Sequence, residues 1–196
     1  IWGYHYTHDR KKYLLRLYLM GVFMGFFCYA LNNFVEPLGG YGNHNIFVPR
    51  FLGGVLSSTI EMFQKDTRKG TKMILAIFAV QFLYYLLPSF LPFLRNLDGD
   101  IRTAFLPNLA INEYGFAFVA LGVVLYFVRE SREQFCAGYL LFCIYQFSLE
   151  MLSAGSCLQS GMILALPLMM KYNRQKGPGM KYFFYIFYPA HTFLLF

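Results

Sequence analysis

The stretch MILAIFAVQFLYYLLPSFLPFL, residues 73–94, contains no charged residue. Residues 14–31 form a second apolar run, in which Arg16 is the single charge. Runs of about 18 or more apolar residues are long enough to cross the hydrocarbon core of a membrane as helices. These two stretches therefore predict a protein that spans a bilayer and argue against a water-soluble globular domain.

The composition supports the same fold class along the whole chain. Of the 196 residues, 57% are hydrophobic, 20% aromatic and only 14% charged, whereas a soluble domain has about 25% charged residues. We predict an all-α, polytopic transmembrane helix bundle that forms a single domain, residues 1–196. The expected spans are residues 13–31, 44–63, 73–94, 110–128, 134–152, 156–172 and 182–196.

The basic residues predict how the bundle is oriented. Most of them fall in the connections on one side of the seven expected spans, and basic loops usually remain in the cytoplasm. The start of the first span and the loop around Lys69 are therefore expected inside, and the C-terminus outside. A net charge of +7 carried by short loops indicates topology, so nucleic acid is not an expected partner.

His191 is the first candidate for chemistry. It follows Lys181 by ten residues of helix, which places it about 15 Å from the membrane boundary. A histidine at that depth needs a partner or a role. It could act as a general base on an amine or hydroxyl, or it could hydrogen-bond to a neighbouring helix as a packing contact.

Arg50 and Glu113 are the other two candidate site residues. Ionisable groups within membrane segments are expected to face the bundle interior and to mark functional positions. Arg50 could stabilise an oxyanion or orient an acceptor, and Glu113 could orient a histidine or hold an amine. An Arg50–Glu113 or Arg50–Glu150 ion pair that only fixes helix packing is the alternative. The spacing of Cys and His residues predicts no metal site.

The N-terminal end predicts a truncated chain. The first residue is Ile1 rather than Met, and no signal-peptide pattern follows it. We expect that one or two N-terminal helices of a longer protein precede it.

Four blocks of sequence resemble the TraX family, in the same order along most of the chain. They are GYHYTHDRKKYLLRL (residues 3–17), NIFVPRFLGG (45–54), NEYGFAFVALGVVLYF (112–127) and, most specifically, MKYFFYIFYPAH (180–191). The family usually carries an acidic–histidine motif in a first helix, which would lie before Ile1, and an Asp where this chain has Glu113.

The resemblance implies a function and a location. TraX proteins are bacterial inner-membrane proteins grouped with multi-span membrane acyltransferases, and the founding member is associated with acetylation of pilin. It therefore implies an acetyltransferase in the bacterial cytoplasmic membrane with acetyl-CoA as co-substrate, His191 as base, and a peptide amine or a glycan or small-molecule hydroxyl as acceptor. The alternative is a transporter or scaffold with a buried network of His191, Arg50 and Glu113.

Overall fold

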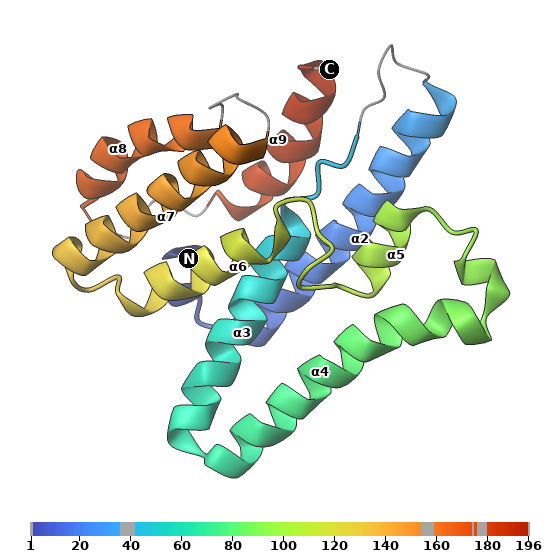
Figure 1. The fold of residues 1–196 in the computed structure, drawn as a ribbon, viewed down its shortest axis with the longest axis horizontal. Coiled ribbons are helices and arrows are strands. Elements are labelled where there is room, and N and C mark those ends of the chain that lie inside the picture. Colours follow the sequence, from blue (N-terminus) through green and yellow to red (C-terminus); the bar gives the residue numbers. More distant parts are fainter. Residues whose placement is uncertain (1, 36–41, 154–158, 174, 176–179, 196) are drawn as a thin grey trace.

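The computed structural model (Figure 1) describes residues 2–35, 42–153, 159–173, 175 and 180–195. Over these residues the chain is helical and has no strand, which confirms the predicted all-α bundle. The elements are α1 (Trp2–His5), α2 (Arg10–Phe34), α3 (Phe47–Lys65), α4 (Thr67–Phe90), η1 (Pro92–Leu94), α5 (Gly99–Phe105), α6 (Gly115–Phe127), α7 (Arg132–Ser153), η2 (Gln159–Ala165), α8 (Leu166–Met170) and α9 (Lys181–Leu194).

Three of these helices are long and apolar enough to cross a membrane: Arg10–Phe34, Thr67–Phe90 and Arg132–Leu152. They correspond to three of the seven expected spans. The other expected spans coincide with helices that are shorter or more polar, and residues 156–158 of the sixth lie outside the described residues. The count of seven therefore stays a prediction, whereas a helical membrane bundle is established.

The helices differ in how much they contact one another. In α4 only 6% of the most apolar window is buried, and Figure 1 shows this helix (green) at the edge of the bundle. By contrast, a hydrophobic core joins α2, α3 and α9. Its buried members are Leu17, Met24, Cys28, Leu31, Phe47 and Tyr188.

Helix α9 runs in the same direction as α2. Near its start, Tyr185 interacts with Arg16. Near its end, the ring of Phe193 lies 6.5 Å from that of Phe27. Phe47, at the first position of α3, packs its ring against Phe184, Tyr185 and Tyr188 of α9. These contacts bring the C-terminal helix, which carries His191, against the N-terminal half of α3.

Glycines allow α2 to approach its neighbours closely, as expected of small residues between membrane helices. A Cβ atom on Gly25 would lie 2.7 Å from the Cβ atom of Ala104 in α5. A Cβ atom on Gly21 would lie 3.1 Å from Val48 in α3. The Gly21–Gly25 spacing therefore serves two different interfaces of the same helix.

Helix α5 forms between two of the expected spans, residues 73–94 and 110–128, where the sequence predicted no helix. Its first turn is capped by Asp98, whose carboxylate accepts a hydrogen bond from the Asp100 backbone at 2.8 Å. Ile101 and Ala104 are then buried against α2. A cap followed by a short apolar face is sufficient for a helix that tertiary packing stabilises.

Gly25→Ala should destabilise the bundle, because the added methyl group overlaps Ala104 across the α2–α5 interface. We expect a loss of about 1–3 kcal/mol, measured as a lower thermal melting temperature of the purified protein in detergent. Gly53→Ala is the matched control, because its Cβ atom meets nothing within 4 Å and alanine favours a helix. Equal melting temperatures for the two variants would contradict the packing described here.

Candidate active site

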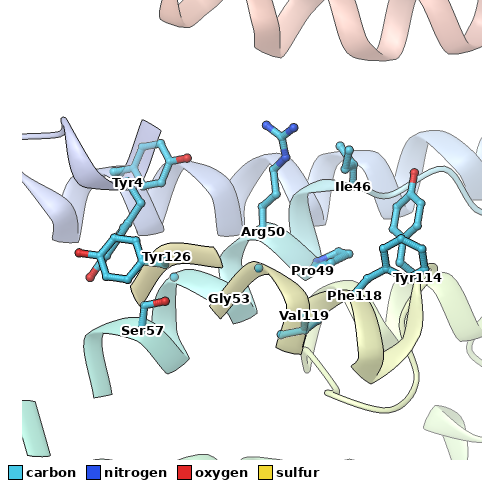
Figure 2. Close-up of a pocket in the computed structure, with 13 residues that line it drawn as sticks. Tyr4, Ile46, Pro49, Arg50, Gly53, Ser57, Tyr114, Phe118, Val119 and Tyr126 are labelled. Carbon is cyan, nitrogen blue, oxygen red and sulfur yellow. The ribbon is translucent and has the colours of Figure 1, made fainter. Parts of the chain in front are cut away.

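A cavity of about 210 Å³ lies between α3 and α6 (Figure 2). Tyr4, Tyr126 and Ser57 lie at one end of the view, Tyr114 and Phe118 at the other, and Arg50 lies between them. The lining residues are Tyr4, Tyr13, Ile46, Pro49, Arg50, Gly53, Gly54, Ser57, Tyr114, Phe118, Val119, Gly122 and Tyr126.

One face of α3 forms the floor of the cavity. Its lining residues begin at Ile46 and recur every three or four positions to Ser57, which is the spacing of a single helical face. At 1.5 Å per residue this face is about 16 Å long. A Cβ atom on Gly53 would meet nothing within 4 Å, and the same holds for Gly122 in the facing helix α6. These two glycines therefore leave the cavity open.

Arg50 has no carboxylate partner among the ion pairs of the described part of the chain. Its guanidinium group lies over the ring of Phe184 in α9, 4.7 Å from the ring centre. Figure 2 shows the side chain rising away from α3. The predicted alternative of an Arg50–Glu113 ion pair is therefore not what the structure shows.

Glu113 lies in the loop that leads into α6, and that loop is held in place by polar contacts. Gln81 of α4 accepts a hydrogen bond from the Leu109 backbone at 2.7 Å and donates one to the Pro107 carbonyl at 3.1 Å. Gly115 then has a φ of +71°, a conformation that glycine adopts without strain. This turn places Glu113 and Tyr114 directly before the first residue of α6.

The surroundings of Glu113 are partly apolar, and its side chain is only 14% exposed. Its Oε1 atom lies 3.7 Å from Nδ1 of His44. Burial raises the pKa of Glu113 from 4.5 to about 7, and the nearby Tyr114 hydroxyl and Asn45 backbone only partly oppose this. The carboxyl can therefore exchange a proton near neutral pH.

Tyr114 and Tyr188 connect this carboxyl to α9. The Tyr114 hydroxyl interacts with both Glu113 and the hydroxyl of Tyr188. Tyr188 is buried, and its ring contacts that of Phe47 at 5.4 Å. The chain of contacts therefore runs from the loop before α6 to the middle of α9.

His191 lies one helical turn beyond Tyr188. Its Nδ1 atom is 2.8 Å from the Tyr188 carbonyl. Because a carbonyl can only accept, Nδ1 carries the proton and Nε2 is left as the free lone pair. The imidazole stacks on Phe187 at 5.0 Å and is partly exposed. His191 is not among the residues that line the cavity, although it shares a helix face with Tyr188.

The opposite end of the cavity contains a second polar network. Arg10 pairs with Glu61, and the Tyr126 hydroxyl donates to the same carboxylate. Arg10 also lies over the ring of Tyr4, 4.8 Å from its centre, and Arg129 lies over Tyr126 at 4.4 Å. This network ties the start of α2 to the last turns of α3 and α6.

The sequence identified Arg50, Glu113 and His191 as candidate site residues, but it did not predict which side chains contact them. His44 was missed as the histidine next to Glu113, although a role of Glu113 in orienting a histidine was expected. Tyr188 was also missed. The spacing of Phe184, Tyr188 and His191 places all three on one face of a helix and could have indicated Tyr188. Tyrosines are so frequent in this chain, however, that this spacing does not distinguish Tyr188 from the others.

Comparison with known proteins gives one finding. Residues 101–196 match the family model described as TraX protein. Over these residues the chain belongs to the TraX family. The TraX resemblance is therefore confirmed over the range that contains the blocks at residues 112–127 and 180–191, whereas the blocks at residues 3–17 and 45–54 precede the match. The TraX match includes Glu113, Tyr188 and His191, whereas Arg50 and His44 precede it. No curated protein and no solved structure matches the chain.

Glu113→Gln should change how stability depends on pH. The folded state raises the pKa of Glu113 from 4.5 to about 7, so the folded chain binds more protons than the unfolded chain between these values. Stability is then lost as the pH rises through this range. We therefore expect the melting temperature of the variant to fall less than that of the wild type as the pH rises from about 5 to 8.

The exposed Glu133→Gln variant is the control for this pH series. If the difference in melting temperature between wild type and Glu113→Gln stays constant from pH 5 to pH 8, the raised pKa is wrong.

Proposed function

We propose that this TraX family membrane protein transfers an acetyl group from acetyl-CoA to an amine or hydroxyl acceptor. One observation carries the proposal: a cation lines a cavity within the helices, and next to Tyr114 at one end of that cavity a near-neutral carboxyl lies beside a histidine. These are Arg50 of α3, Glu113 of the loop before α6, and His44 before α3. Acyl transfer needs a base for the acceptor and a positive group for the oxyanion.

In the proposed reaction a base removes the proton of the acceptor as its nitrogen or oxygen attacks the thioester carbon. Negative charge develops on the carbonyl oxygen, and the C–S bond then breaks to release the thiol of coenzyme A with a proton. Arg50 is suited to the developing charge, because it has no carboxylate to neutralise it. A group that titrates near pH 7, as Glu113 does, is suited to accept and return the proton.

Two histidines are candidates for the base. His44 lies beside Glu113, which would hold its Nδ1 atom and stabilise the imidazolium. His191 has its Nδ1 proton directed to the Tyr188 carbonyl, so its Nε2 atom is available as an acceptor. The contact of Tyr188 with Tyr114 supports a role for both histidines around one acceptor.

The distribution of basic residues supports an orientation for the donor. Arg10, Lys65 and Arg129 lie at the end of the bundle where the Arg10–Glu61–Tyr126 network joins α2, α3 and α6. We propose that this end faces the cytoplasm of a bacterial inner membrane, where acetyl-CoA is found and where basic loops attract its phosphates.

Acetyl transfer is tested by release of the free thiol from acetyl-CoA by the purified protein in detergent with candidate amines and sugars. Arg50→Gln should lower kcat/KM by about 10²–10³-fold. His44→Gln and His191→Gln should each be assayed. The variant that removes the base should have a kcat/KM about 10²–10⁴-fold lower than that of the wild type.

His8→Gln, at an exposed histidine before α2, is the control and should keep full activity. Full activity in both His44→Gln and His191→Gln would contradict the assignment of the base. If no thiol is released with any acceptor, and the protein instead moves a solute across vesicles, the transporter alternative is correct.

The proposed orientation predicts that the C-terminus lies outside. A phosphatase reporter that is active only outside the cytoplasm, fused after Phe196, should therefore be active in cells, and a fusion in the loop at Asp66 should be inactive. The reverse pattern would contradict the orientation.

A further inference from the structure

Tyr4 of α1 places a hydroxyl group without a partner in the wall of the cavity between α3 and α6. The residue lines the cavity and is only 4% exposed, and its hydroxyl has no hydrogen-bond partner among the described residues. Figure 2 shows this hydroxyl pointing along the cavity toward Arg50. A buried donor without a partner is costly to the folded state, and a ligand that accepts its hydrogen bond removes that cost.

The ring of Tyr4 is held in place by its neighbours. The guanidinium group of Arg10 lies 4.8 Å from the ring centre, and the rings of Tyr126 and Tyr13 lie at 5.5 and 6.2 Å. A Cβ atom on Gly54 would come within 3.6 Å of the same ring. The hydroxyl therefore occupies a fixed position before any ligand arrives, which reduces the entropy lost on binding.

The rest of the cavity wall indicates what kind of ligand fits. None of the described residues that line it is acidic, and its polar groups are tyrosine and serine hydroxyls and the guanidinium group of Arg50, all of which can donate hydrogen bonds. A Cβ atom on Gly53 or Gly122 would meet nothing within 4 Å, so a narrow passage remains between the two helices. The cavity therefore suits a slender chain that carries carbonyl oxygens.

We propose that this cavity binds the amide-bearing arm of coenzyme A, and that Tyr4 donates a hydrogen bond to an amide carbonyl of the arm. The inference rests on the proposed acetyl transfer, which supplies acetyl-CoA as the donor. The arm has as many main-chain bonds as about four peptide residues, which span about 13–14 Å when extended. The cavity floor from Ile46 to Ser57 is about 16 Å long, so the extended arm fits along it.

The direction of the arm follows from the two ends of the cavity. Tyr4 and Ser57 lie at the same end, and Arg10 covers the ring of Tyr4 there. This basic end would receive the nucleotide part of coenzyme A. Arg50 lies about 10 Å farther along α3 than Ser57. The sulfur at the tip of the arm would therefore pass Arg50 and approach Tyr114, the residue that follows Glu113.

The contribution of the arm is measured by isothermal titration calorimetry on the purified protein in detergent. The probes are coenzyme A and 3′-phospho-ADP, which is the same nucleotide without the arm. We expect the wild type to bind coenzyme A at least about tenfold more tightly than 3′-phospho-ADP. This measurement needs no acceptor and no turnover.

Filling the passage should remove the advantage of the arm. Gly53→Leu places a side chain in the open space of the cavity, so this variant should bind coenzyme A no more tightly than 3′-phospho-ADP, with the affinity for 3′-phospho-ADP unchanged. Gly122→Leu should act in the same way from the facing helix and serves if Gly53→Leu does not fold. Ser148→Leu adds a leucine at an exposed position of α7 and should bind both probes like the wild type.

Tyr4→Phe tests the hydrogen bond itself. The variant should bind coenzyme A about three- to tenfold more weakly and should raise the KM for acetyl-CoA while kcat is unchanged. Its melting temperature without ligand should not fall, because the hydroxyl has no partner among the described residues. A purely structural role would lower the melting temperature instead. Tyr145→Phe, at an exposed tyrosine, is the control and should leave all three quantities unchanged.

The inference is wrong if the wild type binds coenzyme A and 3′-phospho-ADP equally, or if the two leucine variants and Tyr4→Phe bind coenzyme A like their controls. Thiol release by the wild type together with either result would reject the cavity as the site of the arm and leave acetyl transfer standing. Arm-dependent binding without thiol release would support the cavity assignment and reject acetyl transfer.

Discussion

The close approach of α2 to α3 is the constraint on which the rest of the site depends. Gly21 and Gly54 provide it, because a Cβ atom on Gly54 would lie 2.5 Å from Leu14 and one on Gly21 would lie 3.1 Å from Val48. The buried Asn45 side chain adds a hydrogen bond to the Gly21 carbonyl at 2.8 Å. In a bilayer, where apolar surface gains little from helix association, such close packing and hydrogen bonding hold helices together. It also places Tyr13 of α2 and Arg50 of α3 in the lining of the same cavity.

The adjacent glycines of α3 have opposite effects, and the difference explains why a cavity exists beside a tightly packed interface. Gly54 faces Leu14 and allows contact, whereas Gly53 faces open space. Neighbouring residues in a helix point about 100° apart. A single Gly–Gly pair therefore serves two surfaces, one that stabilises the bundle and one that leaves room for a ligand.

The sequence was sufficient for the parts of the fold that depend on local composition. Long apolar runs predicted α2, α4 and α7, and the order of the sequence blocks predicted the TraX family. It was not sufficient for pairings that depend on how each helix is rotated, such as His44 with Glu113 or Arg10 with Glu61. These residues are far apart in the chain, and no local signal indicates which face of α3 or α6 meets the other. Helix α5 was missed because its apolar face is too short to stand out without its partner α2.

The two ends of the α3 face show how charge is distributed in this bundle. At one end, Glu61 is satisfied by Arg10 and Tyr126, so that the charge of the carboxylate stabilises three helix ends and is not available for chemistry. Toward the other end, Glu113 in the loop before α6 has a pKa of about 7, and Arg50, between the two ends, has no carboxylate partner among the ion pairs of the described residues. A charged group that is already paired gains little free energy from contact with a substrate. A charged group without a partner in a partly apolar site gains more when a ligand supplies that partner. Arg50 and Glu113, for which the sequence left an ion pair open as an alternative, therefore do not neutralise each other in the described part of the chain.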